Sequence, residues 1–323
     1  MHYLLALLLS CSALVASAAE ITTADAQRLQ QLSQDLQIPL TDLQQAIGQA
    51  QLRQPVIDAI QKPWEAKPWY QYRPLFITEA RVRNGVLFWQ QHADWLAKAE
   101  QQLKVPAEII VAIIGVETRY GSQMGEHPVL DALYSLGFHY PARAPYFSKE
   151  FAQYVKLAKQ QGWPLRNPKG SYAGAMGMGQ FMPTSYLHFA RDFDGDGHID
   201  LFANPADAIG SVGNYFAEHE WHWGEPVAHL AQVADASKVA TLLDGKLEIN
   251  QSWQQLQAAG VTLSTTLAPA TPVKLLKLDQ AMGTEYWVLR HNFYVITRYN
   301  RSPLYAMAVY QLSEKIAAAY HDQ

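Results

Sequence analysis

Apolar residues recur at intervals of three and four along most of the chain between residues 22 and 220, which is the periodicity of helices with one buried face. The pattern predicts two short helices within residues 22–60, separated at Pro39, and one longer helix over residues 76–103. The intervening segment 62–74 is rich in proline and aromatic residues, so we expect an ordered loop there.

The next segment differs because residues 109–116 are apolar on every face of a helix. We expect this helix to be buried, to have Pro106 at its first position and to end by Gly121, a typical C-terminal cap. Further helices are predicted over residues 128–138 and 146–160, and from Asn204-Pro205 to residue 219.

Beyond residue 225 the pattern is less regular, and Pro269 and Pro272 indicate a linker. Runs of β-branched and aromatic residues predict short strands at Val273–Leu278, Glu285–Arg290 and Phe293–Arg298. A final helix is expected over residues 304–320. The predicted fold class is therefore mainly α with a small β-containing part (α+β).

The composition is that of a folded globular protein: of 323 residues, 49% are apolar and 17% charged, with a net charge of -4. Because nucleic acids require clustered Lys and Arg, this weakly acidic chain without a basic block argues against a nucleic-acid partner. The 9 Trp and 17 Tyr suit stacking on sugars, although a core rich in aromatic residues is the alternative.

The N-terminus predicts export. An apolar run from Tyr3 to Ala16 is followed by an A-x-A cleavage pattern ending at Ala18, so residues 1–18 are interpreted as a signal peptide of a periplasmic protein. The alternative is an outer-membrane lipoprotein acylated at Cys11, the single cysteine. No later stretch is long and apolar enough for a membrane span. Cleavage leaves no cysteine for disulfides, zinc thiolates or nucleophilic catalysis.

Glu117 is the strongest candidate for chemistry. On a helix it shares a face with Ile110, Ile113 and Ile114, so desolvation raises its pKa, and the negative end of the helix dipole acts in the same direction. Both effects favour the protonated form that a general acid needs. The alternative is a structural ion pair with Arg119.

The segment Ser171–Pro183 contains three glycines and two alanines in its first nine residues, so a ligand can approach its backbone closely. Gln180 offers a donor and an acceptor that suit an N-acetyl group. A phosphate loop is excluded because its Lys-Ser/Thr ending is absent. Close helix packing through small residues is the alternative.

A third motif resembles the first half of an EF-hand calcium loop. The acidic residues Asp192, Asp194 and Asp196 stand at positions 1, 3 and 5, and Gly197 stands at position 6. His198 at position 7 would contribute its backbone carbonyl.

The second half of this loop is incomplete. Asp200 can act through water at position 9, but position 12 is Ala203 in place of the bidentate acid, and the neutral Asn204 follows. We therefore expect weakly bound structural calcium, with no cofactor required for the chemistry. A hydrated acidic turn, or a site that tolerates sodium, is the alternative.

Several motifs occur together in order over residues 25–310. They are Val116-Glu117-Thr118-Arg119-Tyr120-Gly121 with Gly125, Val129–Leu133, Tyr140-Pro141, Ser171–Pro183, Asp192–Asp200, Asp207–Val212, Asn292-Phe293-Tyr294 and Arg298-Tyr299-Asn300. This series resembles the lytic murein transglycosylase B family, which cleaves peptidoglycan.

The resemblance implies a lysozyme-like helical core with a flanking α-domain and a small β-domain. The expected division is a signal peptide (1–18), an N-terminal helical domain (19–104), the catalytic core with the EF-hand-like loop (105–225), a β-containing domain (226–300) and a C-terminal helix packing back on the α-domain (301–323).

The resemblance also implies cleavage of the β-1,4 bond between N-acetylmuramic acid and N-acetylglucosamine. Glu117 would protonate the glycosidic oxygen and then accept a proton from the muramoyl C6 hydroxyl, which attacks C1 of its own ring to give a 1,6-anhydro product. An internal hydroxyl has a very high effective concentration, so it outcompetes water. The expected partners are glycan strands, with cell-wall synthesis enzymes as further candidates.

The family pattern assigns further positions to substrate binding. Ser171 and Gln180 would hold the saccharide and its N-acetyl group, and Arg143 would bind a carboxylate, beside Ala142 where the family has a second arginine. The aromatic positions lining the cleft would be Tyr72, Tyr215, Tyr294 and Tyr299.

Two alternative functions remain. A hydrolytic muramidase would need a second carboxylate opposite Glu117, and Asp131 and Glu126 are near it in sequence. An inactive peptidoglycan-binding scaffold would not need both Glu117 and Gln180.

Overall fold

The computed structural model describes residues 22–62 and 67–322, so the predicted signal peptide and Cys11 lie outside the described residues. Residues 22–60 form the helices α1 (Thr23–Leu36), α2 (Leu40–Gln49) and α3 (Gln54–Ile60), where two were predicted. The extra helix begins because Pro55 stands in its first turn, where the missing N–H is no loss. Helices α1 and α2 pack against α9 (Ala144–Gln161), and α3 packs against α8 (Val129–His139).

The loop prediction for residues 62–74 was wrong for its second half, which forms α4 (Trp69–Phe76) with Pro74 inside it. The helix is only two turns long, so the proline removes little hydrogen bonding, and the buried rings of Trp69 and Tyr72 hold it against the core. The single helix predicted over residues 76–103 is also wrong. It is divided at His92 into α5 (Glu79–Gln91) and α6 (Ala93–Leu103).

Helix α7 (Ala107–Thr118) is buried on nearly every face, as predicted. It packs against α5, α6, α15 (Pro303–His321) and α11 (Pro205–Glu218). Its C-terminal cap is Arg119 in the left-handed region (φ 50°), and not Gly121 as predicted; Pro106 is the N-cap. The left-handed turn continues through Tyr120, whose ring lies against Gly115 and Gly85, where any side chain would collide with it.

The helices predicted between residues 128 and 219 are confirmed as α8, α9 and α11, and Asn204 caps α11 by accepting a hydrogen bond from the Ala206 N–H. A short helix, α10 (Pro183–Phe189), packs between α9 and α11. The strands β1 (His127–Pro128) and β2 (Lys169–Gly170) form an antiparallel pair that joins the segment after α7 to the start of the Gly-rich segment. A 3-10 turn, η1 (Pro141–Arg143), precedes α9.

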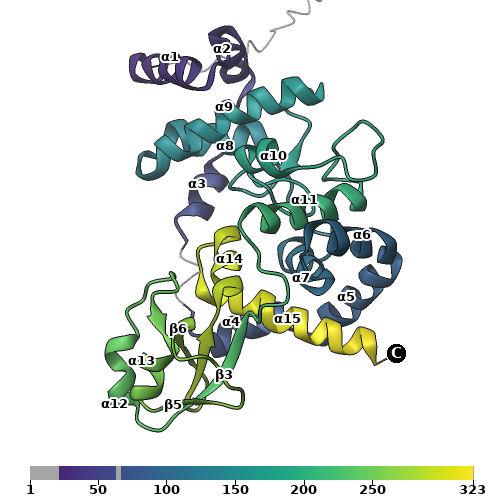
Figure 1. The fold of residues 1–323 in the computed structure, drawn as a ribbon. Coiled ribbons are helices and arrows are strands. Elements are labelled where there is room, and N and C mark those ends of the chain that lie inside the picture. The colour runs from purple at the N-terminus through teal and green to yellow at the C-terminus, as the bar shows by residue number, and fades with distance from the viewer. Residues whose placement is uncertain (1–21, 63–66, 323) are drawn as a thin grey trace, which may run out of the picture.

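In the described part of the chain a five-stranded antiparallel sheet follows α11, in the order β4-β6-β7-β3-β5. Its strands are β3 (Ala228–Val233), β4 (Gln251–Ser252), β5 (Val261–Leu263), β6 (Pro272–Asp279) and β7 (Thr284–Leu289). With α12 (Ala236–Val239), η2 (Ala240–Leu242) and α13 (Trp253–Ala258) it forms a lobe beside the helices, at the lower left of Figure 1. The lobe has its own apolar cluster, which includes Trp253, Leu256 and Val288.

Two of the predicted strands are confirmed as β6 and β7, but Phe293–Arg298 is not a strand: it lies within α14 (His291–Tyr299). A short apolar run fits either structure, and here Phe293 and Ile296 share a helical face that is buried. The final predicted helix is α15, which runs across α4, α5, α7 and α14 (Figure 1). The mainly helical α+β class is confirmed.

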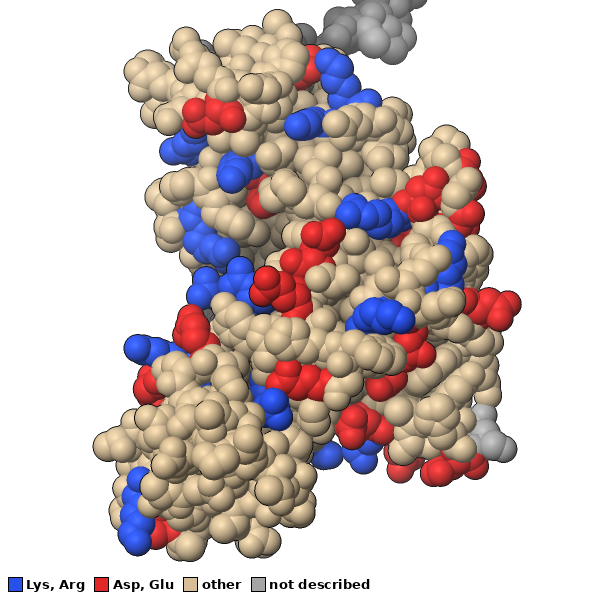
Figure 2. All heavy atoms as spheres, in the orientation of Figure 1, with Lys and Arg blue, Asp and Glu red and all other residues tan. Residues whose placement is uncertain are grey.

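The surface carries mixed charge. On the face drawn in Figure 2, Lys and Arg side chains are scattered among Asp and Glu side chains, with no continuous basic field. Among residues 22–62 and 67–322, no helix has the length and apolar character needed to cross a bilayer.

Candidate active site

Glu117 lies in the last turn of α7, with its side chain half-buried. The helix ends there because Arg119 and Tyr120 turn left-handed and their N–H groups bond back to the carbonyls of Gly115 and Ile114. Burial raises the pKa of the Glu117 carboxyl to about 7, so both protonation states are populated near neutral pH.

The contact that defines this carboxyl comes from α15. The Tyr305 hydroxyl donates a hydrogen bond of 2.5 Å to Oε1 of Glu117. This bond favours the anion and so lowers the pKa of Glu117, against the larger effect of burial. Tyr305 is 3% exposed, and Ser302 caps the first turn of its helix by accepting from the Tyr305 N–H. The ring is therefore held in place by both packing and backbone.

Thr118, the residue after Glu117, fastens the helix end to the Gly-rich segment. Its buried hydroxyl donates to the Met178 carbonyl at 2.8 Å and accepts from the Gly121 N–H at 2.9 Å. The segment itself approaches residue 125 closely: a Cβ on Gly125 (φ 95°) would lie 2.1 Å from the Gly170 carbonyl oxygen. Small residues here serve close backbone contact, which places residues 171–180 beside Glu117.

Gln180 and Ser171 lie at the two ends of this segment, and both are half-buried. Gln180 is left-handed (φ 52°), and its Nε2 donates to the carbonyls of Met124 (3.1 Å) and Gly177 (3.0 Å). Because both donors point to the protein, its Oε1 is the atom left for a ligand. The Ser171 Oγ accepts from the N–H groups of Ala173 and Ala175 and so shapes the loop, while its own proton remains to donate.

Two of the predicted cleft tyrosines meet in space. The Tyr299 hydroxyl donates to the Gly179 carbonyl at 2.5 Å, and its ring lies 4.7 Å from that of Tyr215. The Tyr215 hydroxyl donates to the Arg298 carbonyl at 2.6 Å. The Glu117 charge contributes to raising the pKa of Tyr299 well above its usual value, behind the larger effect of burial, so the two groups are close. This pair braces α14 and α11 against the Gly-rich segment.

The other predicted binding residues have separate surroundings. Tyr72 is 9% exposed, and its ring is 6.3 Å from Trp69 and 5.0 Å from Phe76. It contributes to the raised pKa of Tyr305, so it lies near that tyrosine. Tyr294 is half-buried, and the Arg298 guanidinium lies 5.9 Å from the centre of its ring.

Arg143 is exposed at the start of α9, with its guanidinium 5.0 Å from the Tyr146 ring centre and 4.9 Å from that of Phe147. Tyr146 contributes to the raised pKa of Tyr215, so this arginine approaches the tyrosine pair from the α9 side.

The carboxylates that a two-acid mechanism would need are engaged elsewhere or exposed. Asp131 is fully buried and binds Arg53 at 2.9 Å and Arg166 at 3.0 Å, and it also accepts from the Gln51 N–H. Asp131 therefore holds the start of α3 to α8. Glu126 is exposed.

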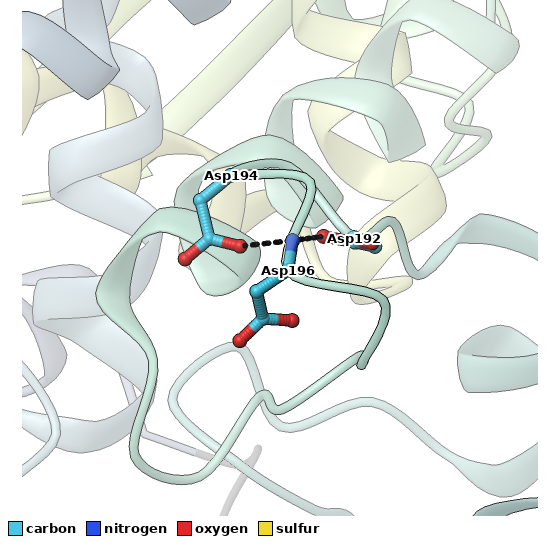
Figure 3. Close-up of side chains that lie close together, drawn as sticks. All are labelled: Asp192, Asp194 and Asp196. Atoms are coloured by element: carbon cyan, nitrogen blue, oxygen red, sulfur yellow. Dashed lines mark hydrogen bonds between the residues drawn. The ribbon is translucent and has the colours of Figure 1, made fainter.

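The acidic loop is a separate site. The carboxylate oxygens of Asp192, Asp194 and Asp196 lie within 4.8 Å of one another, a spacing that suits one oxygen-ligated divalent ion. Both Asp192 and Asp194 accept hydrogen bonds from the backbone N–H of Asp196, which orders the loop (Figure 3). His198 is exposed, and its backbone N–H donates to the Asp196 carboxylate.

The residues after this cluster have other partners. Asp200 accepts from the N–H groups of Phe202 and Ala203. Asn204 caps α11 with its Oδ1, and its amide donates to Asp194 at 2.9 Å, which lowers the pKa of Asp194. Asn204 therefore offers the cluster a donor and no oxygen.

A half-buried carboxyl group with a raised pKa, next to a loop of small residues and a group of tyrosines, can serve as the general acid that cleavage of a glycosidic bond requires. The comparisons with known proteins agree. A family model described as "Transglycosylase SLT domain" matches residues 22–314. Membrane-bound lytic murein transglycosylase B of Escherichia coli K12 is 49% identical over 251 residues, covering 78% of this chain and 68% of that protein.

Solved structures give the same result. Soluble lytic transglycosylase SltB1 of Pseudomonas aeruginosa, in its catenated form, has a TM-score of 0.87 and 44% identity, covering 93% of this chain and 98% of that one. E. coli Slt35 in complex with calcium has a TM-score of 0.82 and 44% identity, covering 92% and 93%. P. aeruginosa SltB3 in complex with NAG-anhNAM-pentapeptide has a TM-score of 0.78 and 28% identity, covering 90% and 78%.

The chain belongs to the transglycosylase SLT domain family. Its fold is the lysozyme-like one of that family, and it is a lytic murein transglycosylase, as the sequence motifs predicted.

Sequence reasoning missed Tyr305 and the role of Thr118. Tyr305 stands on the face of α15 that carries Ala308 and Leu312, so its pattern predicts only core packing. Thr118 is a polar residue one position after the acid, and only the chain folding back at Met178 gives its hydroxyl a partner.

Proposed function

We propose that this enzyme cleaves the β-1,4 bond between N-acetylmuramic acid and N-acetylglucosamine in peptidoglycan and forms a 1,6-anhydromuramoyl product, with Glu117 as its only acid and base. The observation that carries the proposal is the pKa of Glu117, raised to about 7 in a carboxyl group whose hydrogen-bond partner is Tyr305 and not another acid. A group poised near neutral pH can donate a proton in one step and accept one in the next.

In the first step, protonated Glu117 gives its proton to the glycosidic oxygen while the bond to C1 breaks. The resulting carboxylate is stabilised by the Tyr305 hydroxyl, and its negative charge would offset the positive charge that develops on the sugar ring. In the second step, Glu117 takes the proton of the C6 hydroxyl while the C6 oxygen forms a bond to C1. The acid is thereby regenerated, and the product is one water lighter than a hydrolysis product.

The binding roles follow from which atoms are left to a ligand. Gln180 Oε1 accepts from an acetamido N–H, and the Ser171 hydroxyl donates to a saccharide oxygen. Tyr72, Tyr215, Tyr294 and Tyr299 form the aromatic wall, and Arg143 binds a carboxylate. The proposed division keeps residues 105–225 as the catalytic core and 226–300 as the β-containing domain.

Asp192, Asp194 and Asp196 are proposed to hold a structural calcium ion, with the His198 carbonyl as a further ligand. The relative solved with calcium supports this assignment. The ion would supply no chemistry to the sugar. The loop precedes α11, so its ordering fixes the helix that carries Tyr215.

The proposed location is the periplasm after cleavage at Ala18. The relative named as membrane-bound supports the alternative, acylation at Cys11. Mass spectrometry of the mature N-terminus separates them: an unmodified chain beginning at Ala19 supports cleavage, and a diacylglyceryl-modified Cys11 supports the lipoprotein.

Mass spectrometry of digested peptidoglycan tests the reaction. Anhydro-muropeptides as the main product, absent from a digest with Glu117→Gln, support the proposal. Reducing-end products from wild-type enzyme would instead indicate a hydrolytic muramidase, and no cleavage by well-folded enzyme would indicate a binding protein.

A further inference from the structure

Two arginines lie next to α7, the helix that carries Glu117, and neither has a role in the proposed reaction. Arg81 of α5 and Arg119, the C-terminal cap of α7, both line a cavity of about 260 Å³ together with Thr78, Asn84 and Tyr120. The two arginines come from different helices, and the Tyr120 hydroxyl, which donates to the Arg81 carbonyl at 2.7 Å, ties them together.

Arg81 is 9% exposed, and its Nη1 is buried without a hydrogen-bond partner. Its only ring contact in the described chain is the Phe76 side chain, 5.5 Å away. Burial lowers the pKa of Arg81, and the positive charge of Arg119 lowers it further, while Tyr120 acts in the opposite direction. A buried guanidinium is normally paired with a carboxylate, and an unpaired one is costly.

Arg119 is exposed, and within residues 22–62 and 67–322 its side chain makes no ion pair or hydrogen bond. Both arginines line one cavity whose lining contains no acidic residue, and guanidinium groups are well suited to binding carboxylate or phosphate oxygens. In the described part of the chain, the lining of this cavity thus supplies two cations and no anion.

We propose that Arg81 and Arg119 form an anion subsite that binds a carboxylate of the peptidoglycan stem peptide. The assignment to a peptide carboxylate rests on the proposed function, since carboxylates are the anionic groups of that substrate. Contacts connect the cavity to the acid: Phe76 lies between Arg81 and Tyr72, and Tyr72 lies near Tyr305, the partner of Glu117. The subsite belongs to α5 and α7, whereas Arg143 stands on η1.

A bound carboxylate would also join α5 to the turn that ends the catalytic helix. Arg119 is two residues from Glu117, so the subsite lies beside the turn that ends the helix of the acid. Two arginines, in addition to Arg143, would then bind the stem peptide.

The test compares two substrates, peptide-bearing glycan strands and the same strands stripped of peptide by an amidase. Arg119→Gln, at an exposed position, is the first variant, and Arg81→Gln is the second. Each is expected to raise KM on peptide-bearing strands about tenfold more than on stripped strands, with kcat little changed, because each loses a charged hydrogen bond. Arg83→Gln, an exposed arginine on the same helix, is the matched control and is expected to show no such difference.

Melting curves with inorganic phosphate at constant ionic strength distinguish binding of a free anion from binding of a stem-peptide carboxylate. Stabilisation by phosphate that both variants abolish, without a difference between the two substrates, would show a site for free anions and overturn the peptide assignment. Equal losses on both substrates would show a merely structural role and overturn it as well. Neither result affects the proposed role of Glu117. That role is tested separately, by the anhydro products of the wild-type enzyme and the inactivity of Glu117→Gln.

Discussion

The Tyr305 hydroxyl lies 2.5 Å from Oε1 of Glu117, although the two residues are 188 positions apart in sequence. The acid is delivered by α7 near the middle of the chain and its partner by α15 at the end. Since the tyrosine stabilises the anion while burial favours the neutral acid, the pair sets how readily the carboxyl group gives and takes back a proton.

Replacing Glu117 with Gln is expected to reduce turnover by at least about a hundredfold, because the amide has a similar shape but cannot transfer the proton. Lysis of purified sacculi measures the loss, and circular dichroism confirms the fold. Substantial residual turnover would show that another residue is the catalytic acid.

Tyr305→Phe is expected to move the alkaline limb of the pH profile upward. Wild-type activity should fall as pH rises through about 7, because the acid form of Glu117 is consumed. Without the hydroxyl the anion loses its donor, so the pKa of Glu117 rises by about one pH unit. The measurement is kcat/KM from pH 5 to 9. An unchanged limb would show that the hydrogen bond does not tune the acid.

Glu117→Gln is also expected to stabilise the fold at alkaline pH. The folded-state pKa of about 7 is above the ordinary carboxyl pKa of 4.5, so the folded protein holds a proton that the unfolded chain releases. Wild-type stability therefore falls as pH rises from about 4.5 to 7, by at most ~3 kcal/mol. The variant should be more stable at pH 8 and equal at pH 4. Denaturant melts at both values measure the difference, and equal stability at pH 8 would contradict the assigned pKa.

Calcium is expected to raise the melting temperature only at millimolar concentration. Three carboxylates attract the ion, but Ala203 offers no acid and Asn204 is occupied as a helix cap, so Kd should be on the order of 10⁻⁴–10⁻³ M. Asp194→Asn should abolish the shift, and Ala203→Glu should strengthen binding. A tight site that survives chelator in the wild-type protein would contradict this account.

Gly125→Ala is expected to destabilise the fold by at least about 2 kcal/mol, because φ is positive and the new Cβ would strike the Gly170 carbonyl. Gly162→Ala is the matched control: φ is also positive, but nothing lies within 4 Å, so about 1 kcal/mol is expected. Thermal melts compare the two. Activity of the Gly125 variant should fall as well, since Gly170 leads into the Gly-rich segment. Equal losses of stability would show that only backbone strain matters.

Local pattern alone was enough to predict the elements that contain one continuous signal. The apolar run before Glu117 predicted a buried helix, Asn204-Pro205 predicted the start of α11, and the β-branched runs predicted β6 and β7. It failed where competing signals are local and weak. Trp69–Phe76 is helical despite Pro74, and Phe293–Arg298 lies within a helix, because packing of a few buried rings outweighs small intrinsic preferences.

The sequence by itself determined the family, singled out Glu117 as the candidate acid and gave the residue types of the acidic loop, because these depend on motifs that lie within short stretches. Only the tertiary structure decided the partners of those residues. It placed the Tyr305 hydroxyl on Glu117 and paired Asp131 with Arg53 and Arg166, which removes Asp131 as a second acid. It also left Arg81 without a counterion among the described residues. A hydrogen bond or an unpaired charge depends on distances between segments far apart in the chain. The periodicity of apolar residues indicates only which face of an element is buried, so those distances cannot be predicted from it.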